Sequence, residues 1–87
     1  IFFSNTRKMI AGVQIRAARG ILRWSLKDLA KASGVSLPTV QRIELQDGVP
    51  NTKAKTLLDI RNALEIAGIE FIGTPDDGPG VRLKPKL

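Results

Sequence analysis

The sequence predicts a compact all-α core of four to five helices that contains a helix-turn-helix, followed by a short C-terminal β-hairpin. Apolar residues recur at helical spacing in four segments between residues 9 and 67. Two of these segments are separated by only a few residues, and a glycine lies between them. After residue 68, two short β-prone runs flank a stretch rich in Gly and Pro. A chain of 87 residues is long enough for one such domain.

The first helix is expected from Met9 to Leu22. Its apolar residues form two adjacent ridges, Val13, Ala17 and Ile21, and Ile15, Ala18 and Leu22. Such spacing is typical of an amphipathic helix. Residues 1–8 precede it and are interpreted as an N-terminal extension, a cloning remnant or an ordered strand.

The second helix is expected to follow Ser25, whose hydroxyl can accept a hydrogen bond from an early backbone N–H. Asp28 lies three residues later, which resembles a capping box, and its charge favours the positive end of the helix dipole. The helix should end at Ser33, because Gly34 can adopt the left-handed conformation that terminates helices.

The third helix is expected to begin after a second capping residue, Ser36. Pro38 is tolerated because first-turn N–H groups have no intrahelical acceptors. This helix should end near Leu45, before the turn-forming residues 46–50.

The fourth helix is expected over residues 53–67, with Gly68 as its stop signal. Residues 69–72 and 81–83 are the β-prone runs, and residues 73–80 are interpreted as an eight-residue connection between them. The pair Asp76 and Asp77 in this connection is read as solvated turn residues rather than as a metal site.

The join between the second and third helices has the features of a helix-turn-helix. Two helices that cross steeply over a short turn need a small residue at their closest approach and a residue that accepts positive φ. Ala30 and Gly34 fill these positions, and Val40 and Ile43 provide the apolar residues that dock the second helix of the pair.

The composition favours a polyanionic partner and disfavours an enzyme. The chain has 14 Lys and Arg against 8 Asp and Glu, a net charge of +6. It has no His and no Cys, so the commonest general base, metal ligands and thiol nucleophile are missing. We therefore predict that the protein is not an enzyme and needs no metal or cofactor.

Residues 15–68 resemble the lambda-repressor/Cro (XRE) family of helix-turn-helix proteins. Four segments carry the resemblance, the first of which begins one residue earlier, at Gln14. They are QIRAAR at 14–19, WSLKDLA at 24–30, SGVS at 33–36 and TVQRIE at 39–44. The resemblance implies a compact lambda-repressor-like bundle of four or five helices that binds DNA. It also implies that Arg19 and Glu44 form a partly buried pair between the first and third helices.

The positions of the candidate DNA contacts follow from placing Val40 and Ile43 on the inner side of the recognition helix, residues 37–45. The outer side then carries the candidate base-reading residues Leu37, Pro38, Gln41 and Arg42. Of these, Arg42 best suits guanine, because its planar fork matches O6 and N7 together. Candidate phosphate contacts lie near the starts of three helices, namely Ser25, Lys27, Ser36, Thr39, Asn51, Thr52, Lys53 and Lys55.

Three features depart from the family pattern. Leu26 stands where a phosphate-contacting Gln is frequent, and Arg23 stands where Gly or Asn often ends the first helix, which predicts local strain or a different turn there. Leu37 and Pro38 stand where polar readers are usual, which predicts weaker sequence readout or readout of DNA shape. Trp24 is interpreted as a core residue rather than as a base-stacking one.

These observations predict a bacterial, cytoplasmic transcriptional regulator that binds specific double-stranded DNA sequences. We expect a helix-turn-helix domain over residues 9–68, and residues 69–87 as a β segment and basic tail that helps to form a homodimer. No apolar run approaches the roughly 18 residues of a membrane span, so no membrane partner is expected. The alternative is an antitoxin-like or adaptor module that uses the same fold to bind a protein partner.

Overall fold

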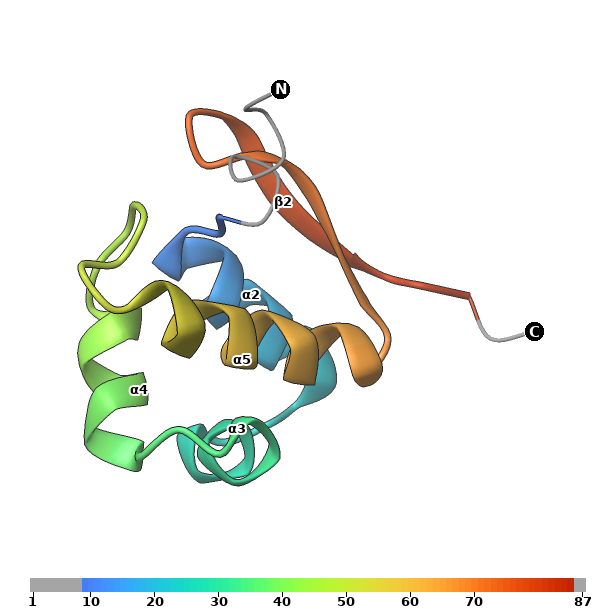
Figure 1. The fold of residues 1–87 in the computed structure, drawn as a ribbon. Coiled ribbons are helices and arrows are strands. Elements are labelled where there is room, and N and C mark those ends of the chain that lie inside the picture. Colours follow the sequence, from blue (N-terminus) through green and yellow to red (C-terminus); the bar gives the residue numbers. More distant parts are fainter. Residues whose placement is uncertain (1–8, 86–87) are drawn as a thin grey trace.

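The computed structural model describes residues 9–85, so the interpretation of residues 1–8 lies outside it. Over this range it comprises α2 (Gly12–Leu22), α3 (Leu26–Ser33), α4 (Leu37–Glu44), α5 (Ala54–Ile66), β1 (Ile69–Thr74) and β2 (Asp77–Leu83). In Figure 1, α5 crosses the middle of the molecule, with the hairpin above it and α3 below it. The predicted fold class, a helical core with a C-terminal hairpin, is confirmed.

A single apolar core joins all four described helices to β1. Its fully buried aliphatic residues are Ile10, Ile15, Leu29, Val40, Ile43, Ile60, Leu64 and Ile69. Burial of each such side chain contributes about 1.5–3 kcal/mol relative to an exposed position. Because Ile69 belongs to this core, the hairpin begins inside the packed unit that the helices form.

Only one of the two apolar ridges of α2 is buried, which corrects the expectation for this helix. Ile15 and Ala18 are fully buried, whereas Val13 is 39% and Ile21 42% exposed. Helical periodicity identifies both ridges but does not say which one its neighbours cover. Here α4, α5 and β2 pack against the side that carries Ile15, and the Val13 side faces outward. The helix also begins at Gly12 rather than at Met9.

Of the capping interactions predicted around the α3–α4 turn, those of α3 form and that of α4 does not. The Ser25 N–H donates to Asp28 Oδ2 (2.8 Å) and the Asp28 N–H donates to Ser25 Oγ (3.0 Å), which completes the capping box. Gly34 has φ of 75° and ends α3 in the left-handed conformation, as predicted. The expectation that Ser36 caps α4 is wrong, because its hydroxyl donates to Thr39 Oγ1 (2.9 Å) instead.

The hairpin is longer and its connection shorter than the sequence indicated. The strands pair from Ile69 opposite Leu83 to Thr74 opposite Asp77, and the predicted eight-residue connection is a turn at residues 75–76. Gly73 has φ of 71° and lies in a bulge, where a Cβ atom would overlap the carbonyl oxygen of Gly78. The glycines thus serve a bulged ladder rather than a loop.

Gln14 links the hairpin to the helices. Its side chain is buried, and its Nε2 donates to the carbonyls of Ile72 (3.3 Å) and Gly80 (3.0 Å). Its Oε1 accepts from the N–H of Ala11 at 2.8 Å, just before α2 begins. One buried amide therefore satisfies three backbone groups, which fixes the hairpin over the start of α2.

Candidate nucleic-acid interface

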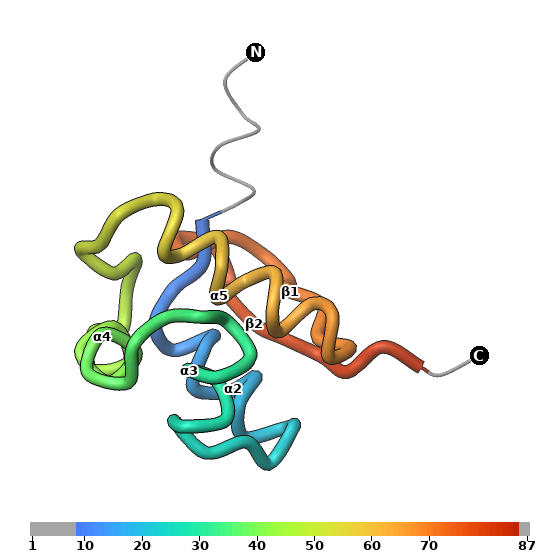
Figure 2. The backbone as a smooth tube through the Cα atoms, turned by 60° about the horizontal axis from the view of Figure 1, so that its bottom comes forward, coloured from blue at the N-terminus to red at the C-terminus, as the bar shows by residue number. Residues whose placement is uncertain are grey.

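The helix α4 has one buried side and one side that faces solvent. Val40 and Ile43 are fully buried and dock the helix on the core. Pro38, Gln41 and Arg42 are exposed on the opposite side. Figure 2 shows α4 nearly end-on at the periphery of the molecule. Leu37 differs from the expectation, because it is half-buried rather than fully outward.

The candidate phosphate contacts gather at the N-terminal ends of α3, α4 and α5. Ser25 and Lys27 are exposed at the start of α3, although the Ser25 hydroxyl already caps that helix. At α4, exposed Ser36 and half-buried Thr39 hydrogen-bond to each other. Helix N-termini attract anions because their first N–H groups lack intrahelical partners and the dipole is positive there.

The start of α5 carries the third group of candidate phosphate contacts. Asn51 and Lys53 are exposed and Thr52 is half-buried. Lys53 occupies the N-cap position, and its side chain makes no capping hydrogen bond to the first N–H groups of α5. Lys55 is exposed and forms an i,i+4 ion pair with Asp59 (3.0 Å).

Arg19 of α2 and Glu44 of α4 form an ion pair, as the family resemblance implied. Arg19 donates from Nε to Oε2 (2.8 Å) and from Nη2 to Oε1 (2.9 Å) of Glu44, a bidentate geometry. The third nitrogen donates to the carbonyl of Trp24 (2.8 Å). The hydrogen bonds to Glu44 raise the pKa of Arg19, and the Glu44 side chain is only 6% exposed. The pair connects the back of α4 to α2.

Two further residues of α2 contact the C-terminal end of α4, and sequence reasoning missed both. Arg16 donates to the backbone carbonyl of Glu44 and to Asp47 Oδ1 (2.6 Å). The N–H of Gly12 donates to the carbonyl of Gly48 (2.8 Å). A Cβ atom on Gly12 would overlap the carbonyl oxygen of Gln46, so only glycine permits this approach. The available signal was a glycine at the start of a predicted helix, where nothing local requires one.

Arg42 contacts its own chain in the α4–α5 loop, residues 45–53. Its Nη1 donates to the carbonyl of Asn51 at 2.9 Å. The side chain of Gln46 accepts from the N–H of Asn51 (2.9 Å) and donates to the carbonyl of Arg42 (3.4 Å). The candidate base reader and a candidate phosphate contact are therefore joined directly.

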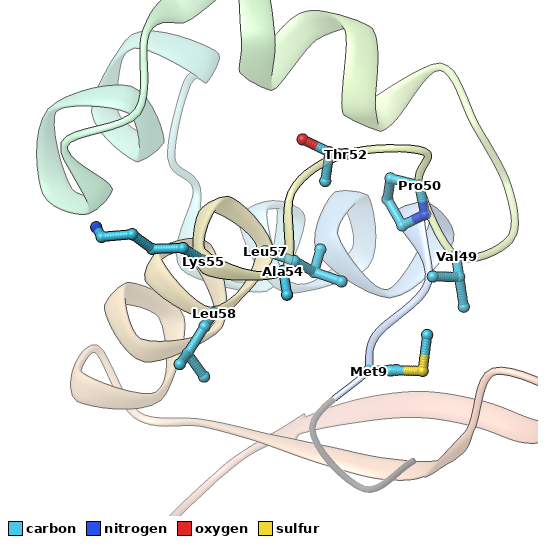
Figure 3. Close-up of a pocket in the computed structure, with 8 residues that line it drawn as sticks. All are labelled: Met9, Val49, Pro50, Thr52, Ala54, Lys55, Leu57 and Leu58. Atoms are coloured by element: carbon cyan, nitrogen blue, oxygen red, sulfur yellow. The ribbon is translucent and has the colours of Figure 1, made fainter. Parts of the chain in front are cut away.

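An apolar groove of about 510 Å³ lies beside the start of α5. Figure 3 shows Met9, Val49 and Leu58 around it, with Thr52 and Lys55 also among its lining residues. Met9, Val49 and Leu58 are each more than a third exposed. The groove adjoins the candidate phosphate contacts Thr52 and Lys55.

The departures at Arg23 and Leu26 have structural counterparts. Arg23 adopts φ of 58° and ends α2 in the left-handed conformation, so of the two predicted outcomes, strain or a different turn, the structure shows a strained backbone. Leu26 packs against the core, so an apolar contact replaces a polar side chain there. Trp24 also packs partly buried against the core, consistent with its interpretation as a core residue.

Comparison with known families accords with this geometry. The helix-turn-helix family model, of the lambda-repressor/Cro-like (XRE) type, matches residues 15–71. The chain matches none of the curated proteins and none of the solved structures with which it was compared. Among residues 9–85, no helix has the length and apolar content needed to cross a membrane.

Proposed function

This chain belongs to the lambda-repressor/Cro-like (XRE) helix-turn-helix family, and from that premise we propose that it regulates transcription by binding specific double-stranded DNA sequences. The recognition helix, residues 37–45, enters the major groove in this proposal. Pro38, Gln41 and Arg42 face the base edges, with the half-buried Leu37 at the margin of the contact. The helix N-termini of α3, α4 and α5 face phosphates, which set register and affinity.

One observation carries the proposal. Pro38, Gln41 and Arg42 are exposed on the outer side of α4, while Val40 and Ile43, both fully buried, anchor its inner side. A helix in this state can enter a groove without rearrangement of its own domain. The charge of +6 supports the same partner, because a net positive field attracts the phosphate backbone.

The proposal is tested by selecting bound duplexes from a random DNA pool and titrating the selected sequence at several salt concentrations. Neutralised phosphates release counterions, so log K should fall linearly with log salt by about 0.9 per phosphate contacted. Lys53→Ala should reduce this slope by about one contact. Lys84→Ala is the matched control, because Lys84 follows the end of β2, outside the helix N-termini proposed to contact phosphates, and should leave the slope unchanged.

A slope near zero, or a pool with no enriched sequence, would refute DNA binding by this surface. That result would favour the antitoxin-like or adaptor alternative, in which the same fold binds a protein.

We further propose that the regulator acts as a homodimer on a palindromic site, since one helix-turn-helix makes few contacts and two half-sites are read by paired units. The outer face of the hairpin supplies the contact in this proposal, because Ile72 is 41% exposed there, on the face opposite the buried Ile69. Ile72→Lys should shift sedimentation toward the monomer and leave the helical circular dichroism unchanged. Deletion of the hairpin is unsuitable as a test, because Ile69 is a core residue. A dimer that persists in Ile72→Lys would place the contact elsewhere.

A further inference from the structure

Arg42 and Gln46 form a closed set of hydrogen bonds with Asn51, which we call the Asn51 network. Arg42 binds the carbonyl of Asn51 and Gln46 binds its N–H, each at 2.9 Å. Gln46 also donates to the carbonyl of Arg42 at 3.4 Å. Both backbone groups of Asn51 are thus bonded to side chains that extend from α4 or its immediate continuation.

The Asn51 network attaches the second half of the α4–α5 loop to α4. The first half of the loop is attached to α2, through the N–H groups of Gly12 and Val13 and through Arg16. Asn51 lies after Pro50, a buried residue with a fixed φ, and directly before Thr52 and Lys53. A contact at Asn51 therefore determines where the start of α5 lies relative to the recognition helix.

From this geometry we propose that Arg42 and Gln46 are positioning residues, which fix the phosphate-contacting start of α5 against α4 so that both engage DNA as one rigid surface. The inference rests on the proposed DNA-binding function and deepens it. It assigns Arg42 a role toward its own chain that guanine recognition does not require. It also gives Gln46, which is half-buried and was not a candidate DNA contact, a function in binding.

The proposal separates from simple base reading because the two roles need different chemistry. Reading guanine needs the planar fork of arginine, which lysine lacks. Donating one hydrogen bond to the Asn51 carbonyl needs a single N–H, which lysine can supply. A reader changes the preference at one base pair when it is replaced, whereas a positioning residue changes affinity for all duplexes alike.

The test uses Gln46→Met, Arg42→Lys and Lys53→Ala in the full chain. Gln46→Met keeps the length and neutral charge of the side chain and should weaken binding about tenfold on the selected duplex and on random duplex equally. Arg42→Lys should remove the preference at the base pair that Arg42 reads but keep Asn51 in place, because lysine lacks the planar fork and can still donate one hydrogen bond. Lys53→Ala should lower the DNA-binding affinity about tenfold in the wild-type background. In the Gln46→Met background it should lower the affinity less than about threefold, because the α4–α5 loop is already released from α4.

Amide hydrogen exchange of the free protein gives a readout without DNA. The Asn51 N–H should exchange at least tenfold faster in Gln46→Met, while the N–H of Ile60 in the core stays protected, which shows that the fold is intact. Three results would each overturn the proposal: unchanged Asn51 exchange in Gln46→Met, an undiminished Lys53→Ala effect in the Gln46→Met background, or Asn51 exchange in Arg42→Lys as fast as in Gln46→Met. If the wild type binds no duplex, the proposed function fails, and the exchange of Asn51 still decides whether the network orders the loop.

Discussion

The two ends of the recognition helix are held in opposite ways. At its C-terminal end, α4 and the residues after it receive hydrogen bonds from Gly12, Arg16 and Arg19 of α2. At its N-terminal end, Ser36 makes no capping bond and Pro38 has no N–H to donate. The first turn of α4 therefore has no side-chain cap, although Val40 anchors it to the core.

This difference shows how the domain divides orientation from recognition. The direction of α4 is set from behind, where a bidentate ion pair and backbone hydrogen bonds leave little freedom. The N-terminal end, which meets base edges in helix-turn-helix proteins, keeps its groups available for an external ligand. Substitutions of the α2 residues that hold the C-terminal end, and of Glu44, should consequently affect stability, and those in the first turn of α4 should affect binding.

The largest effect is expected for Gly12→Ala. The added Cβ would overlap the Gln46 carbonyl and lie 2.9 Å from that of Ile43, and backbone cannot move aside as a flexible side chain can. We expect a loss of about 3 kcal/mol of unfolding free energy, at the upper end of overpacking effects. Urea denaturation measures this through the midpoint at unchanged m-value.

Gly20→Ala is the matched control in the same helix. Nothing lies within 4 Å of a Cβ at this position, so the substitution should stabilise the helix by about 0.5–1 kcal/mol. Equal effects of the two substitutions would contradict the view that α2 approaches the end of α4 through Gly12.

The next effect is expected for Glu44→Ala, which leaves the guanidinium of Arg19 without its carboxylate. Arg19 is 24% exposed, so the cost should be about 2 kcal/mol rather than the 3–5 kcal/mol of a fully buried charge. Replacing both residues by Met should recover part of this loss, because no unpaired charge remains.

Asp59→Ala serves as the control, since its partner Lys55 is 83% exposed and the pair should contribute less than about 0.5 kcal/mol. A double-mutant cycle by urea denaturation compares the pairs, and equal costs would refute the special role of the α2–α4 bridge.

The parts of the molecule that the sequence predicted correctly depend on local rules. The capping box of Ser25 and Asp28 and the left-handed Gly34 each involve four consecutive residues or fewer, so their chemistry can be read directly. The inward positions of Val40 and Ile43 follow from helical spacing once a second helix is assumed. These features fixed the location of the candidate interface.

The parts that were missed depend on neighbours distant in sequence. Gly12 and Gln46 are 34 positions apart by numbering, and no local pattern brings them together. The outward side of α4 was predicted, but not the bond of Arg42 to Asn51, which depends on the path of the loop. In the hairpin, Gly73 and Gly78 lie in a stretch whose composition is typical of a loop. Only the pairing of the two strands shows that these glycines form a β-bulge.

The smallest effect compares the two serines that precede the helices of the motif. Ser25→Ala removes a capping bond of 3.0 Å and should cost about 1 kcal/mol, whereas Ser36→Ala removes no cap and should cost only about 0.3 kcal/mol. Both variants would be measured by thermal and urea unfolding. Binding should show the reverse order if the first turn of α4 meets DNA, because the Ser25 hydroxyl is already occupied by its own helix while that of Ser36 can turn from Thr39 to a phosphate. A Ser36→Ala variant that loses as much stability as Ser25→Ala would show that the N-terminal end of α4 is capped after all, and the contrast between its two ends would disappear.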